Sequence, residues 1–577
     1  MKLKTNKKKR STGALEVISA LKKNKIKEVF VYPGGTIAPV LDLIEKSKIR
    51  IFCSRHEQGA GYAALAASKV KKKPQVAMVS SGPGVTNIVT PVADAYYDSV
   101  PMIIFTGQVG QKDMRGSKKI RQKGFQETDT MSLFQSITKE CFQPKNPDEI
   151  FNVINKAFQV ASSGRPGPVL IDLPMNIQRD YFIIKTRRRK IFKLKTKNNN
   201  KKIPEKKLNK IIRLIINSSK PLILCGHGVV LSQSEKTLRK FATKYKIPVT
   251  MSLLALGAFP TRNYLSLGFH GHTGNQAAGL AIQNCDLLIV VGSRLDLRQV
   301  GTETNEFAKK SKIIRIDIDK DEIINSRIKC NINLKGDVGY ILEKILNKIP
   351  KNLTNNSDWL KQVKKFKNQH QLTYKKTKSI KPQEIIEKIN NLTFSKKTIC
   401  VSGVGQHQQW TARHFDFDNP KKLWFTSGGH GAMGYDLPVA IGSQYVSPKK
   451  LVLCFVGDGS FQMNIQELAS LKVYNLPLKI IVLDNNRLGI VSQFQKLNWN
   501  NDPTCGKKWN PNFSNLAKSY NIFSQTIVNR NNLDNKLQKF LNFKGPSLIH
   551  CIIDKNEEIS PMLLAGQTLD KMWKNEK

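Results

Sequence analysis

Short apolar runs alternate with longer stretches of helical periodicity along most of the chain. From about residue 11 to residue 180 the apolar runs are EVFVYPGG, PQVAMVSSGPG, VPMIIFTGQ and GPVLIDLP. Continuous apolar runs of this length, separated by helices, are typical of parallel strands that are buried on both faces. The pattern therefore predicts an α/β fold built on a doubly wound parallel sheet.

The same alternation recurs twice further along the chain. A second block, from about Lys207 to Leu346, contains PLILCG, IPVTMS, CDLLIVVGSR and KIIRIDID. A third block begins near Lys381 and contains TICVSGVG, KLWFTSGG, LVLCFVGDGS, KIIVLDNN and PSLIHCIID. A chain of 577 residues is too long for one hydrophobic core. We expect two cofactor-binding domains around a spacer, with these bounds: a first domain at 11–182, a basic linker at 183–206, a central domain at 207–350 and a last domain at 380–577.

Composition places the chain among soluble globular proteins, with 40% hydrophobic and 8% aromatic residues. No apolar run approaches the roughly 20 residues that span a bilayer, so no membrane partner is expected. The basic N-terminus lacks an apolar signal core, which indicates a cytoplasmic protein. The nine cysteines are scattered and form no CxxC pair, so they are expected to be reduced thiols rather than disulfides or zinc ligands.

The formal net charge of +51 is the unusual property of the composition. It raises the alternative of a basic nucleic-acid-binding protein, whose binding would depend steeply on salt and would tolerate Asp458→Ala. Lysine is abundant in every region, however, and the densest run, KTRRRKIFKLKTKNNNKK at 185–202, is typical of a solvated linker. No zinc-finger spacing or RNP-type motif accompanies it, so we expect no nucleic-acid partner.

The most informative segment is GDGSFQMNIQELASLKVYNLPLKIIVLDNN at 457–486, which follows the apolar run at 451–456. Gly457 and Gly459 permit a sharp turn and let the backbone approach a ligand. Ser460 can cap the single helix that follows. The exposed N–H groups at the start of this helix favour a diphosphate. The apolar side of that helix would carry Phe461, Ile465, Leu468 and Leu471.

Two polar side chains follow the neighbouring strands of this segment. Asp458 supplies a hard carboxylate oxygen, and Asn485 lies at the end of the next predicted strand. With a backbone carbonyl such as that of Arg487, they leave room for two phosphate oxygens and a water around an octahedral Mg²⁺. The alternative is an ordinary strand–turn–helix connection, because Asp-Gly is a common turn dipeptide. GDGS combined with a strand-terminal DNN favours the metal site.

The GDG and NN elements resemble the metal-binding motif of the thiamine-diphosphate enzyme family. The resemblance implies that Asp458 and Asn485 are side-chain ligands of Mg²⁺, which anchors the cofactor's diphosphate. In this family the pyrimidine-binding and diphosphate-binding domains of one site come from different subunits. The resemblance therefore also implies a homodimer or homotetramer with shared active sites.

A glutamate in the first block is the candidate for cofactor activation. Glu57 lies in CSRHEQGAGYAALAA, where it enters a helix rich in alanine and glycine. A carboxyl group there can share a proton with the cofactor's pyrimidine ring. A surface glutamate in a first helical turn is the alternative. The flanking loops YPGGT, with Gly34 and Gly35, and SSGPGVTN, with Pro83, resemble the family's loops in the same order and favour the catalytic role.

Two loops of the third block complete the resemblance. VGQHQQW, at 404–410, is similar to the loop that contacts the diphosphate, and its candidate ligands are Gly405, Gln406 and His407. TSGGHGAMGYDLPVAIG, at 426–442, is similar to the loop that bends the cofactor. There the resemblance implies that the Gly431 carbonyl accepts the pyrimidine amino group and that Met433 supports the bent conformation. A core methionine is the alternative for Met433.

Within the family, the chain most resembles acetolactate synthase large subunits, as in VGQHQQWTARH, LLALGAFP, RPGPVLIDLP and GFQETD. The resemblance places Phe125 and Gln126 in the active site and implies that Arg294 holds the carboxylate of the second 2-oxoacid. A packing salt bridge is the alternative for Arg294. The implied reaction is decarboxylation of pyruvate and carboligation to a second 2-oxoacid, in branched-chain amino acid biosynthesis. A regulatory small subunit is a further possible partner.

Departures from the pattern leave the acceptor open. Phe494 stands where acetolactate synthases usually carry a tryptophan, and Met175 where they commonly carry a lysine. The loop at 110–124 is also longer and more basic than usual. A related decarboxylase, lyase or hydrolase, or a branch associated with polysaccharide biosynthesis, is therefore the alternative function.

FAD is a possible second cofactor. The segment LGFHGHTGNQAA, at 267–278, resembles the flavin-contacting loop of acetolactate synthases. The alternative is a central domain that has lost its ligand, and CGHGVV at 225–230 is too short a glycine motif to decide between them.

Overall fold

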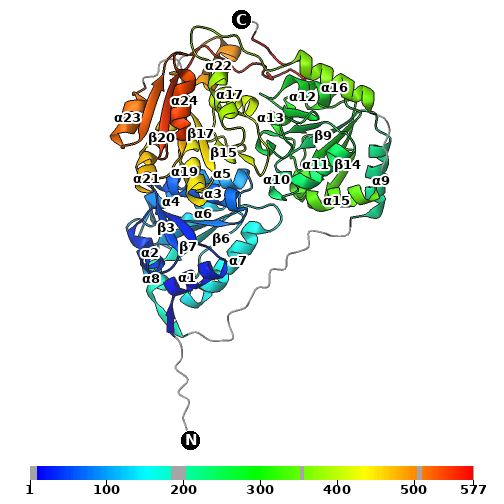
Figure 1. Cartoon of the computed structure of the whole chain (residues 1–577). Helices are drawn as coiled ribbons and strands as arrows, with labels where there is room; N and C mark the ends of the chain where they lie inside the picture. Colours follow the sequence, from blue (N-terminus) through cyan, green and yellow to red (C-terminus); the bar gives the residue numbers. More distant parts are fainter. Residues whose placement is uncertain (1–9, 184–202, 351–355, 503–509, 576–577) are drawn as a thin grey trace. The chain divides into compact units, whose positions relative to one another are not determined.

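The computed structural model describes residues 10–183, 203–350, 356–502 and 510–575 (Figure 1). The run at 185–202 in the expected basic linker lies outside the described residues, as does nearly all of the basic N-terminal segment. Contacts divide the chain into two compact units. The first unit holds residues 1–197, 427–448 and 463–476, and the second holds 198–426, 449–462 and 477–577.

The first unit is built on a six-stranded parallel sheet with the order β3-β2-β4-β5-β7-β6. Its strands are β2 (Glu28–Val31), β3 (Arg50–Cys53), β4 (Gln75–Val79), β5 (Met102–Gln108), β6 (Cys141–Phe142) and β7 (Pro168–Pro174). The four predicted apolar runs correspond to β2, β4, β5 and β7. The pattern missed the two edge strands, because β3 begins with an exposed arginine and β6 has only two residues.

Helices cover both faces of this sheet. The helices are α1 (Gly13–Lys23), α2 (Ala38–Glu45) and α7 (Ile150–Ser162) on one face, and α3 (Glu57–Lys71) and α5 (Val89–Tyr97) on the other. Alternate strand residues supply the two cores, as strand geometry requires. A short antiparallel ribbon joins β1 (Arg10–Thr12) to β8 (Tyr181–Ile183).

The first unit also contains three elements from the third block of the sequence. They are α19 (Asp436–Val446), a 3₁₀ turn at Ile465–Glu467 and α21 (Leu468–Val473). Helix α19 packs along α3, where a Cβ on Gly442 would lie 2.5 Å from the Ala63 carbonyl oxygen. Small side chains on both helices are therefore what permits this close packing.

The second unit contains two further six-stranded parallel sheets. The central one has the order β11-β10-β9-β12-β13-β14. Its strands are β9 (Pro221–Cys225), β10 (Val249–Met251), β11 (Ser266–Phe269), β12 (Leu287–Val291), β13 (Lys312–Asp317) and β14 (Ile332–Lys335). One face packs against α9 (Glu205–Ile216), α11 (Glu235–Lys244) and α15 (Val338–Lys348), and the other against α12 (Gln276–Asn284) and α16 (Ser357–Gln369).

The last sheet has the order β16-β15-β17-β18-β20-β19. Its strands are β15 (Thr398–Val401), β16 (Lys422–Phe425), β17 (Leu451–Gly457), β18 (Lys479–Asp484), β19 (Phe523–Ile527) and β20 (Ser547–Ile552). Its helices in this unit are α17 (Pro382–Leu392), α18 (Gln406–His414), α20 (Asp458–Gln462), α22 (Gly489–Trp499), α23 (Phe513–Ser519) and α24 (Leu533–Asn542). Three parallel sheets with flanking helices confirm the predicted fold class.

The expectation of one helix capped by Ser460 was wrong. Helix α20 begins at Asp458 and ends at Gln462, and the chain then forms the separate 3₁₀ turn and α21. Asn464 interrupts the path with φ −135° and ψ 30°, and its side-chain amide donates to the Gly434 carbonyl at 2.7 Å. An asparagine that satisfies its amide outside the helix competes with helical bonding.

The described cysteines are free thiols, and five of the eight are buried. Burial raises the pKa of Cys285 to about 12, which keeps that thiol protonated. The prediction of reduced thiols is thus confirmed for these eight, and Cys505 lies outside the described residues. Among the described helices, none combines the length and apolar character that crossing a membrane requires.

Candidate active site

Asp458 and Asn485 follow adjacent parallel strands at the same edge of the last sheet. The register places Gly457, the final residue of β17, opposite Leu483 near the end of β18. Both side chains are buried, with 3% of Asp458 and 7% of Asn485 exposed. The sequence placed both residues at strand ends, and the structure brings them to one edge.

Asn485 is held in a fixed orientation by its neighbours. Its side-chain amide donates to Oε1 of Gln406 at 3.0 Å, and its Oδ1 accepts from the backbone N–H of Arg487 at 3.2 Å. The Arg487 guanidinium pairs with Asp502 at 2.7 Å, so its charge is not directed at the Asn485 amide. The side-chain oxygen of Asn485 is thereby oriented as an acceptor.

Asn510 is a residue of this edge that the sequence did not single out. Its Nδ2 donates to Oδ2 of Asp458 at 2.7 Å and to Oδ1 of Asp484 at 2.9 Å. Asp484 in turn accepts from Nε2 of His550 at 2.8 Å. Burial acts to raise the pKa of Asp484, but hydrogen bonds led by that of His550 hold it below its ordinary value. Asn510 therefore links the candidate metal ligand to a second, ionised carboxylate.

Of the residues expected to contact the diphosphate, Gln406 and His407 begin helix α18. Gly405 precedes the helix with φ 148°, a left-handed value that favours glycine. A Cβ on Gly405 or on Gly457 would lie 2.7 Å from Nδ1 of His407. The side chain of His407 thus requires glycine at both positions. The sequence suggested that Gly457 permits a sharp turn, but its φ is not positive. The close approach of His407 is therefore the reason for glycine at this position.

The remaining members of the predicted clamp lie in the same short segment. Gly459 and Ser460 belong to helix α20, and Ser460 is buried. The part of the chain that the structure describes contains no cluster of three or more histidine, cysteine or acidic side chains suited to a metal. A metal here would rest on one carboxylate with amide and carbonyl oxygens, which is a donor set that suits Mg²⁺.

Glu57 is the first residue of α3, in the first unit, and is 7% exposed. Its Oε2 accepts from Nδ2 of Asn87 at 2.9 Å, and His56 caps the helix beside it. Asn87 ends α4 (Pro83–Asn87), so the loop beginning with Pro83 delivers the partner of the glutamate. The sequence had grouped these two segments, and the structure brings them together.

The glycines of the first loop differ in their surroundings. A Cβ on Gly34 would lie 2.4 Å from the Cβ of Ser80, whereas a Cβ on Gly35 would meet nothing within 4 Å. Gly431 has φ +77° and a similarly open side, and Met433 follows it two residues later. Gly34 is thus required by packing, while Gly35 and Gly431 leave space beside the backbone.

Gln126 lies in a strained backbone conformation beside the Pro83 loop. Its φ is +63°, and its Cβ would lie 2.9 Å from a Cβ on Gly82. Phe125 is 85% exposed. The loop that precedes them is tied down by Glu127, which accepts from the backbone N–H groups of Arg115 and Lys123. A non-glycine residue with positive φ costs about 1 kcal/mol or more and is often found at functional sites.

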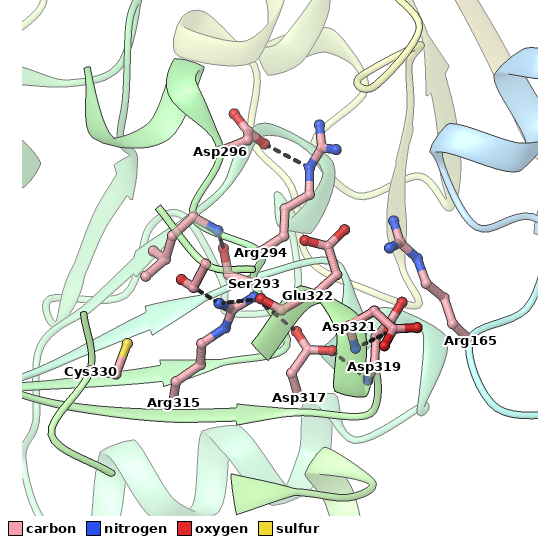
Figure 2. Close-up of polar contacts among 12 residues, drawn as sticks. Arg165, Ser293, Arg294, Asp296, Arg315, Asp317, Asp319, Asp321, Glu322 and Cys330 are labelled. Atoms are coloured by element: carbon pink, nitrogen blue, oxygen red, sulfur yellow. Dashed lines mark hydrogen bonds and ion pairs between the residues drawn. The ribbon is translucent and has the colours of Figure 1, made fainter. Parts of the chain in front are cut away.

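Arg294 belongs to a local network in the central domain. Its Nε donates to Oδ2 of Asp296 at 3.1 Å, as Figure 2 shows. Asp296 also accepts from Nε2 of Gln299 and caps helix α13 (Leu297–Val300). The ion pair observed is thus local to this turn, and the arginine side chain is 38% exposed.

Phe494 lies on α22 and is 47% exposed. Its ring meets the ring of Trp499 edge to face, with centroids 5.5 Å apart. Position 494 thus carries a phenylalanine instead of the usual tryptophan, but the ring of Trp499 lies next to it.

Two histidines follow β11 in the segment that resembles a flavin-binding loop. Burial lowers the pKa of His270 to about 4, and burial followed by the charges of Arg298 and Arg413 lowers that of His272 to about 4. His270 is 3% exposed and contacts Thr250 and Gln299. Both imidazoles are neutral at physiological pH.

These neutral histidines predict a loss of stability in acid. The unfolded chain binds protons below the ordinary histidine pKa of 6.5, but the folded chain does not until about pH 4. The stability is therefore complete above pH 6.5 and falls between 6.5 and 4, by up to about 3 kcal/mol for His270. Urea unfolding midpoints of wild type and His270→Gln at pH 7 and pH 5 measure this. The variant should lose less on acidification, and an equal loss would contradict the assignment.

Comparison with known proteins matches three family models to successive parts of the chain. The N-terminal TPP-binding domain of thiamine pyrophosphate enzymes matches residues 11–133, the central domain 208–345, and the C-terminal TPP-binding domain 403–551. Each match thus covers most of the strands of one of the three sheets.

Several proteins are similar over nearly the whole chain. The mitochondrial acetolactate synthase of Schizosaccharomyces pombe is 36% identical over 576 residues, covering 95% of this chain and 84% of that protein. The acetolactate synthase isozyme 2 large subunit of Escherichia coli is 35% identical over 571 residues, covering 97% and 99%. The large subunit from Lactococcus lactis is 36% identical over 565 residues, covering 97% and 96%.

Proposed function

Because the chain belongs to the thiamine pyrophosphate enzyme family, and within it to the acetolactate synthase large subunits, we propose that it joins two 2-oxoacids with loss of carbon dioxide. In the simplest case, two pyruvate ions and one proton give one acetolactate ion and one carbon dioxide. The observation that carries this proposal is the sequence identity of about 35% with acetolactate synthase large subunits, which extends over all three domains. The product would serve branched-chain amino acid biosynthesis.

The residues at the edge of the last sheet fit Mg²⁺ and a diphosphate. Asp458 and Asn485 would hold the metal with the Arg487 carbonyl, and Gln406 and His407 would contact the diphosphate. The fit rests on the buried, oriented oxygens of Asp458 and Asn485 and on the close approach of His407 to two glycines. When bound, thiamine diphosphate would supply the electron sink for decarboxylation.

Asn510 would fix the orientation of the metal-binding carboxylate. Asn510→Ala removes the donor to Oδ2 of Asp458 and also leaves Asp484 without that partner. Loss of such an outer partner costs about 10- to 100-fold in metal affinity. Titration of Mg²⁺ against acetolactate formation should show this weakening at unchanged thermal stability. An unchanged Mg²⁺ requirement would contradict the role.

In the first unit, Glu57 would exchange a proton with the pyrimidine ring of the cofactor. Asn87 holds one carboxylate oxygen at 2.9 Å, which leaves Oε1 for the ring nitrogen. Burial of the carboxyl group excludes water that would compete for the proton. The fold thus supplies the acid–base group, and the amino group of the cofactor would be received at the Gly431 carbonyl.

The choice of acceptor would lie with Gln126, Arg294 and Phe494. Arg294 would bind the carboxylate of the second 2-oxoacid through its outer nitrogens, while Asp296 holds its Nε. Phe125 would line the same pocket. The substrates are small 2-oxoacids.

Phe494→Trp is expected to raise the preference for 2-oxobutyrate over pyruvate as acceptor. A larger aromatic face contacts the extra methyl group, which is worth about 1–3 kcal/mol, or roughly 10- to 100-fold in product ratio. The ratio of acetohydroxybutyrate to acetolactate, with both substrates present, measures the effect. Phe394→Trp is the control, because Phe394 is also 47% exposed but is not a candidate site residue. A ratio unchanged in both variants would place acceptor choice elsewhere.

Further properties belong to the same proposal. A homodimer or homotetramer would complete each site, a regulatory small subunit is a candidate partner, and the location would be cytoplasmic. FAD would bind at the carboxyl ends of the central strands, near His270 and His272. Visible flavin absorbance of the purified protein would reveal it.

The experiment that tests the proposed function uses purified protein with thiamine diphosphate, Mg²⁺ and pyruvate. We expect acetolactate, dependent on both added cofactors and abolished by a chelator. Acetaldehyde or acetate as the product would instead indicate the related decarboxylase or oxidase reactions. No turnover of pyruvate would refute the proposal.

A further inference from the structure

The segment at 427–433, which carries Gly431 and Met433, is held by the end of helix α5. Asp98 caps that helix. Its Oδ2 accepts from the backbone N–H of Gly428 at 3.2 Å, and its Oδ1 from that of Gly429 at 2.8 Å. One carboxylate therefore fixes two consecutive peptide planes just before Gly431.

The hydroxyl group of Ser427 fixes the backbone at Gly431 itself. Oγ of Ser427 accepts from the backbone N–H groups of Gly431 and Ala432, each at 3.0 Å. Ser427 also hydrogen-bonds the carboxyl group of Asp94. Burial, and then the charge of Asp98, raise the pKa of Asp94 to about 8, which favours the protonated form of Asp94 at neutral pH.

A lysine of α3 compensates the charge of Asp98. Nζ of Lys69 lies 3.6 Å from Oδ2 of Asp98, and their side chains are 8% and 0% exposed. The same Nζ donates to the hydroxyl of Tyr435 at 3.0 Å. A buried carboxylate is stable only with such compensation. Helix α3, which begins at Glu57, is thus linked to the 427–433 segment through Lys69 and Asp98.

Close contacts also fix one side of the 427–433 segment. A Cβ on Gly429 would lie 2.8 Å from the Cβ of Tyr97 and 3.1 Å from Oδ1 of Asp98. The ring of His430 stacks on that of Tyr97, with centroids 5.6 Å apart and an angle of 10°. On Gly431, in contrast, a Cβ would meet nothing within 4 Å. The segment is packed at Gly429 and open at Gly431.

We propose that Asp98 is a positioning residue, which fixes the 427–428 and 428–429 peptide planes and thereby the direction of the Gly431 carbonyl. This inference rests on the proposed function, in which that carbonyl receives the pyrimidine amino group. Misplacement of a reacting group by about 1 Å can cost roughly 100-fold in rate. The reactivity of the cofactor is therefore controlled by a residue that does not touch it.

The test compares Asp98→Asn with Glu28→Gln. Asparagine keeps the size of Asp98 but replaces one acceptor oxygen by an N–H donor, so one glycine N–H loses its partner. Glu28 is the matched control, because it is also a buried carboxylate paired with a lysine of α3, Lys71, but contacts no residue of 427–433 that the structure describes.

The first readout is amide hydrogen exchange of the 427–433 peptide in the cofactor-free protein. Loss of a hydrogen bond to a charged acceptor should speed exchange by roughly tenfold or more in Asp98→Asn. Glu28→Gln should leave this peptide unchanged. Equal protection in wild type and Asp98→Asn would overturn the proposal.

The second readout is the rate at which the C2 proton of bound thiamine diphosphate exchanges with deuterium, without any 2-oxoacid. We expect it to fall about 10- to 100-fold in Asp98→Asn, with Mg²⁺ and cofactor affinity nearly unchanged. Exchange at the wild-type rate overturns the proposal. If Asp98→Asn does not fold, Ser427→Ala, which removes the acceptor of the Gly431 N–H, decides by the same two readouts.

These results separate the inference from the proposed function. Failure of the wild-type protein to form acetolactate refutes the proposed function, even if its cofactor exchanges its proton normally. Wild-type proton exchange in Asp98→Asn refutes the positioning role, even if the wild-type protein makes acetolactate.

Discussion

Replacing Asp458 with asparagine is expected to reduce acetolactate formation by about 1,000-fold or more at any practical Mg²⁺ concentration. The change removes the one carboxylate of the candidate metal site, whose other donors are neutral oxygens. A metal that neutralises phosphate charge contributes several kcal/mol, and about 1.4 kcal/mol corresponds to tenfold in rate. Asn510 would also lose its acceptor at Oδ2, which is now 2.7 Å away. Steady-state rates over a range of Mg²⁺ and thiamine diphosphate concentrations measure the loss.

The control is Asp358→Asn, which removes an exposed carboxylate that pairs with Lys361. Surface pairs of this kind contribute little, so its rate and thermal stability should match the wild type. If Asp458→Asn kept wild-type activity with the same Mg²⁺ dependence, the sheet edge would not be the metal site. Indifference to Asp458→Asn together with tight, salt-sensitive nucleic-acid binding would instead support the basic-protein alternative.

Glu57→Gln is expected to lower kcat by about 100- to 10,000-fold while cofactor binding is retained. Glutamine keeps the size of the side chain and can still contact Asn87, but it cannot exchange a proton with the pyrimidine ring. General acid–base catalysis by one group is worth this range. Rapid-quench measurement of C2 proton exchange in bound thiamine diphosphate isolates the affected step.

Glu45→Gln serves as the control for Glu57→Gln, because Glu45 is an exposed residue at the end of α2. Its proton-exchange rate should equal that of the wild type. A Glu57→Gln enzyme with a normal exchange rate would show that another group activates the cofactor. Loss of cofactor binding, with a normal rate in the bound fraction, would make Glu57 a binding residue instead.

The sequence predicted those parts of the site that depend on local pattern. Asp458 and Asn485 follow apolar strands, and parallel pairing brings successive strand ends to one edge. Glu57 was expected to enter a helix rich in alanine and glycine, and it is the first residue of α3. Periodicity and position were sufficient for the two strand ends, whereas the choice of Glu57 also depended on the resemblance of its flanking loops.

Residues that act through tertiary contact were not predictable. Asn510 reaches Asp458 and Asp484 from a distant part of the chain, and no motif surrounds it. Gly457 is required by the imidazole of His407, which belongs to another strand–helix unit. The interrupted helix after Asp458 has the same origin, because the side chain of Asn464 bonds to Gly434 rather than to its own helix.

The central claim is that this chain forms a carbon–carbon bond between two 2-oxoacids. The most direct measurement uses pyruvate labelled with carbon-13 at its carbonyl carbon, with thiamine diphosphate and Mg²⁺, and carbon NMR of the product. The claim predicts acetolactate in which the ketone carbon and the hydroxyl-bearing carbon are both labelled, adjacent and split by one-bond coupling. Labelled acetaldehyde or acetate without such coupling, or unchanged pyruvate, would contradict it.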